Sequence, residues 1–151
     1  MRPSTEKRLS MNRQAARRAA AFSRIREAHQ TEVAEDYVEL IDDLIGAYGE
    51  ARLVDLAEHM GVSHPTASKI VQRLLREGLV ESRPYRAIFL TDAGRRMADE
   101  ARRRHRIVLE FLRAIGIDEE TAEQDAEGIE HHVSEATLEA LDRLTRDLAR
   151  R

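Results

Sequence analysis

Acidic residues and histidines near the end of the chain have the spacing of metal ligands. In the stretch Asp125-Ala-Glu-Gly-Ile-Glu-His-His132, Glu127 lies three residues before Glu130 and four before His131. If this stretch is helical, the three side chains project from one face. Like charges placed so closely repel one another, and a bound cation would remove that repulsion. The spacing therefore predicts a metal-binding face.

Three further residues extend this donor set. Asp36 and Glu39 repeat the three-residue spacing, and His105 lies on an expected helix between the two acidic segments. Six oxygen and nitrogen donors without sulfur suit Mn2+, with Fe2+, Co2+ and Zn2+ as competitors. The alternative is an ordinary solvated acidic face, which applies more readily to Asp36 and Glu39. We expect His132 to support the site rather than bind directly, because it points about 100° further round the helix, and His29 to be solvent-exposed.

The composition excludes several other kinds of site. The 151 residues, enough for one or two small domains, include no cysteine, which excludes disulfides, thiolate zinc sites, iron–sulfur clusters and a cysteine nucleophile. No apolar run approaches the roughly 20 residues of a membrane span, and the arginine-rich start lacks the apolar core of a signal peptide. We therefore expect a mostly helical cytoplasmic protein with no membrane partner.

The net charge of −3 conceals a strong segregation along the chain. Eight basic residues and one acidic residue give residues 1–26 a net charge of +7, whereas eight acidic residues give residues 27–51 a charge of −8. Twelve bases and seven acids give residues 52–106 a charge of +5, and five bases and twelve acids give residues 107–151 a charge of −7. This alternation indicates a polyanion-binding unit between cation-binding segments.

The first two segments differ in pattern. Residues 1–21 are basic and lack a sustained apolar stripe, which predicts a flexible or conditionally helical arm. From Phe22 to Ala47 apolar residues recur at three- and four-residue steps, which predicts a long helix carrying Asp36 and Glu39. Gly46 and Gly49 mark its expected end.

The middle of the chain has the order of a winged helix-turn-helix. A short amphipathic helix over residues 53–60 is followed by a turn at Gly61, and Ser63 is placed to cap the next helix, in which Pro65 needs no hydrogen-bond donor. Gly78 closes that helix. Residues 79–91 contain strand-forming residues on both sides of Pro84-Tyr85-Arg86, which predicts a hairpin. Helix, helix, helix and hairpin is the winged-helix order.

The second helix of such a motif enters the major groove of DNA, where polar side chains contact base edges and basic side chains contact phosphates. We expect double-stranded DNA to be bound by outward-facing residues of this helix, with Arg86 at the tip of the hairpin meeting phosphate or the minor groove. The expected contacts are Ser63, His64, Pro65, Thr66, Ser68, Lys69, Arg73 and Arg86. The alternative is a winged helix used only for protein contacts, which the positive charge of this block disfavours.

The remaining residues predict an all-helical unit. Thr91 is placed to cap a helix over residues 92–114, Asp118 to cap one over residues 119–131, and Ser134 to begin the last helix. The chain is thus mainly α with a small β-hairpin. We divide it into the arm at residues 1–21, the winged helix-turn-helix domain at 22–104, whose first helix supplies metal ligands, and a helical metal-binding domain at 105–151.

These motifs together resemble the diphtheria toxin repressor family of metal-dependent repressors, most closely its manganese-sensing branch. The similarity covers roughly residues 34–140. Iron-sensing members have a sulfur ligand where this chain has Asp36 and Glu127, so the donor set favours manganese. The motifs that carry the resemblance are Asp36-Tyr37-Val38-Glu39, Val62-Ser63-His64-Pro65-Thr66, Tyr85-Arg86, Phe89-Leu90-Thr91, Arg104-His105 and Glu127-Gly128-Ile129-Glu130-His131-His132-Val133-Ser134.

The resemblance implies a homodimer that binds palindromic operator DNA and represses manganese uptake genes when the metal is plentiful. It also implies two Mn2+ ions per protomer, a dimerisation role for the helical domain, and the short form that lacks the SH3-like third domain of larger relatives. The ligands it implies are Asp36, Glu39, His105, Glu127, Glu130 and His131. It assigns no role to the basic arm.

The residues alone leave two alternative functions open. Paired carboxylates and histidines also describe two-metal hydrolases, but the chain has no glycine-rich phosphate loop or evident nucleophile, so we expect no enzyme and no small organic substrate. A winged-helix regulator of the multiple-antibiotic-resistance type would bind a small molecule at its dimer interface. That interpretation leaves the six-residue donor set unexplained.

Overall fold

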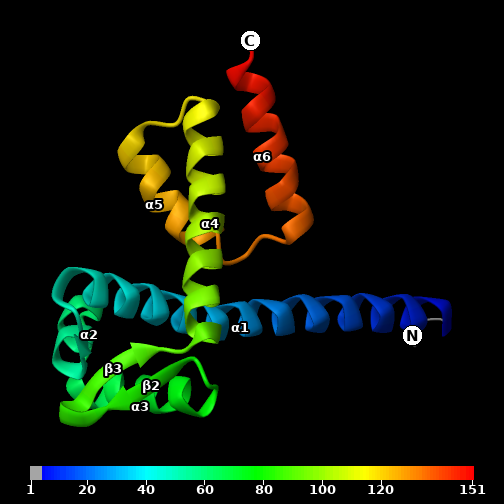
Figure 1. Cartoon of the computed structure of the whole chain (residues 1–151). Helices are drawn as coiled ribbons and strands as arrows, with labels where there is room; N and C mark the ends of the chain where they lie inside the picture. Colours follow the sequence, from blue (N-terminus) through cyan, green and yellow to red (C-terminus); the bar gives the residue numbers. More distant parts are fainter. Residues whose placement is uncertain (1–4) are drawn as a thin grey trace.

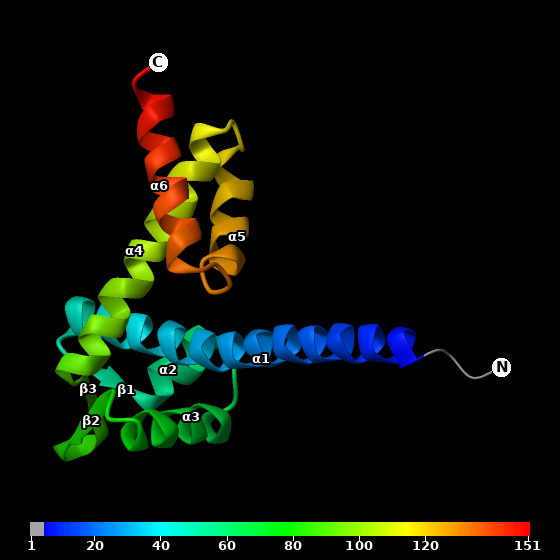
Figure 2. The same cartoon turned by 90° about the vertical axis from the view of Figure 1, so that its right-hand side faces the viewer.

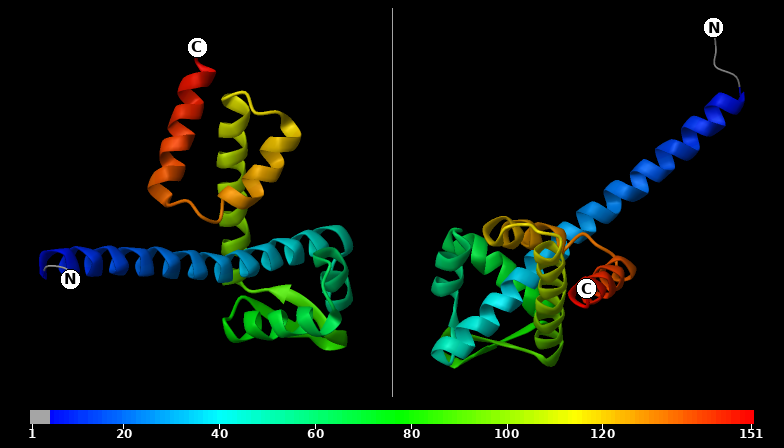
Figure 3. Two further views of the ribbon diagram at one scale, coloured as in Figure 1. Left: turned by 180° about the vertical axis from the view of Figure 1, so that it is seen from behind. Right: turned by 90° about the horizontal axis from the view of Figure 1, so that it is seen from above.

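The computed structural model describes residues 5–151 and begins with one very long helix. Helix α1 spans Thr5–Tyr48, 44 residues, which is about 66 Å at 1.5 Å per residue. It begins at Thr5 rather than near Phe22, because alanine and arginine favour helix even without an apolar stripe. Its first half extends away from the rest of the molecule (Figures 1 and 3). Residues 1–4 of the expected arm lie outside the described residues.

The second half of α1 packs on a small winged-helix unit. This unit contains α2 (Leu53–Met60), α3 (His64–Arg76) and the hairpin strands β2 (Val80–Arg83) and β3 (Ala87–Leu90). The two-residue strand β1 (Ala51–Arg52) pairs antiparallel with β3, so the sheet order is β1-β3-β2. The sequence did not indicate this third strand, which is too short to show a pattern. The core residues that α1 contributes include Tyr37, Val38, Ile41 and Leu44.

The second unit consists of three helices. Helix α4 (Asp92–Ala114) runs up from the hairpin, crosses α1 and packs against α5 (Glu119–Ile129) and α6 (Glu135–Ala149) (Figures 1 and 2). A separate apolar core, with Val108 and Leu138 at its centre, holds these helices together. The expected fold class of a winged helix-turn-helix followed by a helical domain is confirmed. No helix between residues 5 and 151 has both the length and the apolar character to cross a bilayer.

Side-chain caps fix where the helices begin. The hydroxyl or carboxylate oxygens of Ser63, Thr91, Asp118 and Ser134 each accept a hydrogen bond from a backbone N–H three residues later, at 3.0 to 3.3 Å. Each bond satisfies one of the donors that the first turn of a helix leaves without an intrahelical partner. All four caps were predicted, and all four are confirmed.

The start of α4 lies unusually close to the preceding backbone. A Cβ at Gly94 would lie 2.0 Å from the carbonyl oxygen of Leu79, a distance that no side chain can occupy. We expect Gly94→Ala to lower the free energy of unfolding by about 1–3 kcal/mol, because the α4 start must shift away from the hairpin. Chemical denaturation measures this value.

The matched control is Gly46→Ala on α1, where the structure has nothing within 4 Å of the added Cβ. Alanine is the better helix former, so this variant is expected to be neutral or up to about 1 kcal/mol more stable. Equal free energies of unfolding for the two variants would contradict the close approach at Gly94.

Candidate metal centre and nucleic-acid interface

One buried carboxylate lies at the centre of the candidate metal site. Glu130 is 2% exposed and its two oxygens lie between two imidazoles. Its Oε2 is 2.6 Å from His105 Nδ1, and its Oε1 is 3.2 Å from His131 Nε2. A buried carboxylate is stable only when paired or bound to a cation. Glu130 therefore joins α4 to the turn that follows α5.

Two more predicted ligands complete this cluster from either side. Asp36 Oδ1 on α1 lies 3.5 Å from His131 Nε2, and Glu127 Oε1 on α5 lies 3.5 Å from His105 Nδ1. The structure thus brings five of the six predicted ligands together. Glu39, half-buried one turn after Asp36, is near enough that burial, partly offset by Arg102, and the charges of Glu127 and Asp36 raise the pKa of its carboxyl.

The pKa values of the clustered carboxyl and imidazole groups are shifted by burial and by the charges of their neighbours. Burial raises the pKa of Glu130 to about 7 and that of Asp36 to about 6, against the opposing effect of the nearby histidines. Burial would lower the pKa of His105, but the carboxylates of Glu130 and Glu127 outweigh it and raise that pKa. The pKa of His131 is raised against burial by the hydrogen bond to Glu35 and the charge of Glu130. The cluster therefore retains protons near neutral pH.

A single arginine holds the backbone that carries the central ligands. The Arg104 guanidinium donates to the carbonyl oxygen of Glu130 through Nε at 2.9 Å and Nη2 at 2.5 Å, and to that of Val133 at 2.9 Å. Helix α5 ends at Ile129, so the expectation of a helix through residue 131 is wrong at its end. The His132 N–H donates to the Ile129 carbonyl at 3.0 Å, which tightens the chain into a turn. His131 consequently points back to α1 rather than along the face of α5.

Three carboxylates at the edge of the cluster were not among the ligands predicted from the sequence. Glu35 Oε2 lies 2.7 Å from His131 Nδ1, and Glu123 Oε2 lies 3.3 Å from His105 Nε2. The carboxylate of Glu32 can also meet Asp36 and His131, because ligand atoms of these three lie within 4.8 Å of one another. The signal was present, since Glu32 precedes Asp36, and Glu123 precedes Glu127, by the four residues of one helical turn.

Part of the basic charge in the middle of the chain is used within the molecule. Arg102 on α4 bonds Asp42 at 2.6 Å and Asp43 at 2.8 Å on α1, and Arg103 bonds Glu135 at 2.6 Å at the start of α6. The Arg102 pairs join α4 to α1 across the junction of the two units, whereas the Arg103 pair joins α4 to α6 within the second unit. On α3, Lys69 and Arg76 remain exposed.

The predicted DNA-reading residues lie mainly on the exposed side of α3. His64, Pro65, Thr66 and Lys69 are exposed, and the Thr66 hydroxyl lies 2.9 Å from that of the capping residue Ser63. Ser68 is half-buried and, with His64, lines a pocket between α3 and β2. This surface presents hydroxyl, imidazole and ammonium groups, which can reach base edges and phosphates.

Two of the predicted DNA contacts, Arg73 and Arg86, differ from the residues on the exposed side of α3. Arg73 is turned towards α1, where its Nη2 donates to the Gln30 carbonyl at 3.1 Å, and its Nε bonds Glu77 at 2.8 Å. A contact from Arg73 to DNA would break the bond to α1. Arg86 belongs to the 3-10 turn Pro84–Arg86 at the wing tip, but its side chain lies outside the described part of the chain. Beside it Tyr85 is 88% exposed at a φ of 66°, a left-handed conformation that a tyrosine rarely adopts.

Two known protein-family models match this chain, one over each of its two units. Residues 29–88 match the family model described as iron dependent repressor, N-terminal DNA binding domain. Residues 91–151 match that described as iron dependent repressor, metal binding and dimerisation domain. The chain belongs to the iron-dependent repressor family. Members of this family are transcriptional regulators rather than enzymes, which removes the hydrolase interpretation. The match of residues 91–151 to a metal-binding domain removes the multiple-antibiotic-resistance interpretation.

Several proteins similar to this chain are manganese regulators. Transcriptional regulator MntR of Escherichia coli O6:H1 is 54% identical over 119 residues, which are 79% of this chain and 77% of the relative. The solved manganese regulator SloR is 32% identical with a TM-score of 0.66, over 75% of this chain and 53% of SloR. A manganese-dependent transcriptional repressor solved in complex with manganese is 34% identical with a TM-score of 0.62, over 74% and 52%. The match thus covers about half the length of these two solved chains.

The donor set also fits the metal that the family implies. Asp36, Glu39, His105, Glu127, Glu130 and His131 offer oxygen and nitrogen only, with four carboxylates whose crowding a divalent cation would relieve. The resemblance to the manganese-sensing branch of the diphtheria toxin repressor family is confirmed by the family matches and the MntR-type relatives. The chain is a metal-dependent transcriptional regulator.

Proposed function

We propose that this regulator binds palindromic operator DNA as a Mn2+-loaded homodimer and represses manganese uptake genes in the cytoplasm. The observation that carries the proposal is the position of Glu130, buried between His105 and His131, together with the contact of His131 with Asp36 across the junction of the two units. We infer that Asp36, Glu39, His105, Glu127, Glu130 and His131 hold the metal, two ions per protomer. Fe2+, Co2+ and Zn2+ are competitors, because affinity alone favours metals later in the first row.

Helix α1 connects the candidate metal centre to the DNA-reading unit. Asp36 and Glu39 project towards the centre, while Tyr37 and Val38, between them, are buried in the winged-helix core. When bound, the divalent cation supplies the positive charge that these crowded carboxylates lack. Without that charge Asp36, Glu127 and Glu130 repel one another, so α1 is held less firmly against α4 and α5. The orientation of α3 depends on the same helix and is then less defined.

Dimerisation sets the distance between two recognition helices. We infer that residues 91–151 form the dimer interface, and that the two α3 helices are held about 34–36 Å apart, the spacing of successive major grooves. A firmer junction favours this spacing, and each tenfold gain in DNA affinity requires about 1.4 kcal/mol of coupling between metal and DNA binding.

Fluorescence anisotropy with a palindromic candidate operator tests the proposal. The full chain is titrated at fixed salt with chelator, with Mn2+, with Fe2+ under anaerobic conditions and with Zn2+. We expect tight binding with Mn2+ and weak binding with chelator. Equal affinity in all conditions would remove the coupling and leave a winged-helix DNA binder whose acidic cluster serves another purpose.

Metal binding is expected to weaken as the pH falls. The pKa of Glu130 is about 7 and that of Asp36 about 6, and the pKa values of both histidines are raised, so protons occupy the donor atoms that metal must use. Lowering the pH from about 8 to about 6 should therefore reduce Mn2+ affinity steeply, and binding at pH 7 should release protons. Calorimetry in two buffers with different ionisation enthalpies counts those protons. A pH-independent affinity would contradict the raised pKa values.

Lys69 is expected to contribute to DNA affinity without selecting sequence. Its exposed ammonium group lies on the DNA-facing side of α3, so Lys69→Ala should weaken binding to operator and unrelated DNA alike and reduce the slope of log affinity against log salt by about 1. Arg143→Ala on α6 removes the same charge far from α3 and serves as the control. An unchanged salt dependence for Lys69→Ala would place this face away from the phosphates.

A further inference from the structure

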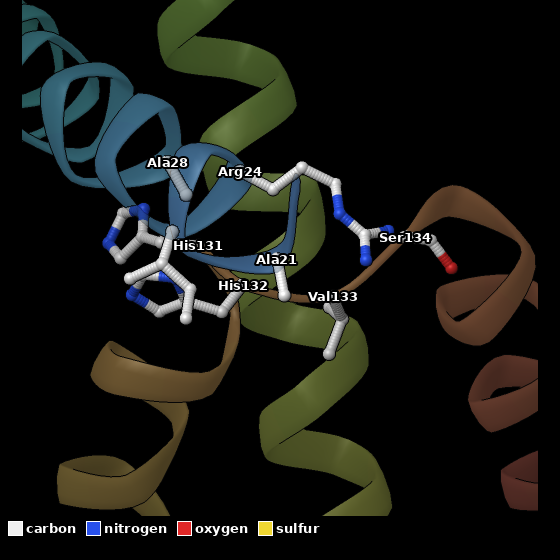
Figure 4. A pocket seen from close by; sticks show the side chains of 8 residues that line it. Ala21, Arg24, Ala28, His131, His132, Val133 and Ser134 are labelled. Atoms are coloured by element: carbon white, nitrogen blue, oxygen red, sulfur yellow. The ribbon is translucent and has the colours of Figure 1, made fainter. Parts of the chain in front are cut away.

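A second cluster of metal-binding side chains lies next to the candidate centre. His29 and Glu32 on α1 meet His132 on the turn after α5, and ligand atoms of the three lie within 4.8 Å of one another. None of these residues belongs to the six ligands of the proposed manganese centre. Figure 4 shows His132 beside His131, in a pocket that α1 lines with Ala21, Arg24, Ile25 and Ala28.

The distances between these atoms are close to those between the ligands of one small cation. His29 Nδ1 lies 3.2 Å and His132 Nε2 lies 3.5 Å from the same oxygen of Glu32, Oε2. Donors about 2.0–2.1 Å from a tetrahedral ion are separated by about 3.3–3.4 Å. The distances around Glu32, one of which is also the hydrogen-bond distance to His29, are short enough for the three groups to bind one ion.

The two imidazoles meet edge to face and keep a ligand nitrogen each within reach of one ion. Their ring centroids are 5.1 Å apart and the planes are inclined by 73°, so the rings do not stack. The side chains of His29, Glu32 and His132 are 63%, 28% and 35% exposed. Water can therefore fill the remaining coordination positions. Since His29 and Glu32 are one helical turn apart, α1 sets their separation without any rearrangement.

The donor types select a different metal from that of the main centre. Two imidazoles and one carboxylate are the ligand set of many zinc sites, and imidazole suits Zn2+, Co2+ and Ni2+ better than Mn2+. Four carboxylates contribute to the main centre but only one to this cluster. We propose that His29, Glu32 and His132 form a separate site for Zn2+ or a similar borderline divalent cation.

This site fastens α1 to the turn after α5 at a second point. His29 lies two helical turns before Asp36, so a cation there holds a part of α1 that the main centre does not reach. Glu32 also belongs to the group with Asp36 and His131. The outer site uses its Oε2, which leaves the second carboxylate oxygen for the inner group. The inference concerns metal binding and does not depend on the proposed DNA target.

The test compares Zn2+ stoichiometry of the full chain with that of His29→Ala, by equilibrium dialysis and metal analysis. His29 is exposed, so its replacement leaves the core unchanged. We expect His29→Ala to bind one Zn2+ fewer per chain and to lose one component of the visible absorption that appears when Co2+ is added. His59→Ala, which removes an exposed histidine on α2, is the matched control and should retain the full stoichiometry.

His132→Ala provides a second variant, checked for folding by circular dichroism, and should lose the same Zn2+ and the same Co2+ absorption. DNA binding in the presence of Mn2+ separates this inference from the proposed function, because His29→Ala should retain it. Equal Zn2+ stoichiometry in the parent chain and His29→Ala overturns the separate site. Loss of Mn2+-dependent DNA binding in His29→Ala with unchanged Zn2+ binding also overturns it, since His29 would then belong to the manganese centre.

Discussion

Replacing Glu130 with glutamine is expected to abolish the response of DNA binding to Mn2+. The substitution keeps the size and an oxygen for His105 but removes the charge at the middle of the cluster. Removing a residue that supports a metal ligand typically costs 10–100-fold in affinity, so we expect the loss of this central carboxylate to reduce Mn2+ affinity by at least about 100-fold. Calorimetry measures the affinity, and fluorescence anisotropy measures the DNA response.

The stability of the metal-free protein should change in the opposite direction. Because the folded state raises the pKa of Glu130 to about 7, stability is lost as the pH rises from the unfolded value through the folded one. Glutamine has no such ionisation, so at pH 7.5 metal-free Glu130→Gln should be at least as stable as the parent. Glu110→Gln, an exposed substitution on α4, should change neither property. A variant that kept its Mn2+ response would show that Glu130 is not a ligand.

Replacing Arg104 with glutamine is expected to have the second large effect. The Arg104 guanidinium is bonded to the carbonyl oxygens of Glu130 and Val133, which hold the turn carrying His131. A hydrogen bond from a charged group contributes about 1.5–3 kcal/mol. We expect the free energy of unfolding to fall by about 2–3 kcal/mol and Mn2+ affinity to fall with it, because the ligands on the turn lose their fixed position.

Arg103→Gln is the matched control for this prediction. Arg103 is the adjacent residue on α4, and its bonds to Glu100 and Glu135 are ion pairs at the surface. Such pairs contribute about 0–1 kcal/mol. Denaturant titrations of both variants, each with and without Mn2+, separate the two roles. Equal losses at the two positions would contradict a special role for Arg104 in holding the turn.

The parts that local patterns determine could be predicted from the sequence. The caps Ser63, Thr91, Asp118 and Ser134 mark helix starts because a short polar side chain satisfies nearby backbone donors. The three- and four-residue spacing of apolar residues gave the core face of α1 from Val33 onward, whereas Phe22 and Ile25 at the start of the same pattern are exposed. The spacing of Asp36, Glu127, Glu130 and His131 indicated the metal-binding groups, because ligands must share a face before tertiary structure can bring two faces together.

The parts that depend on long-range contacts could not be predicted. The end of α5 at Ile129 is determined by the turn to α6 and by Arg104, which lies 26 residues away from Glu130 in the sequence. The bond from Glu35 to His131 spans 96 residues, and no local pattern indicates it. Strand β1 exists only because β3 offers it a partner. The early start of α1 reflects helix propensity without burial, which a search for an apolar stripe overlooks.

The two ends of helix α1 should differ in how easily they unwind. Every side chain from Thr5 to Ala20 is exposed, whereas Tyr37, Val38 and Ile41 are buried. Most of the stability of a helix in a protein comes from tertiary packing, which these first turns lack, so they should unwind and rewind on their own. Their amide hydrogens should exchange with solvent rapidly, and trypsin should cut at the arginines there, while the amides beyond Ala34 stay protected until the whole winged unit unfolds.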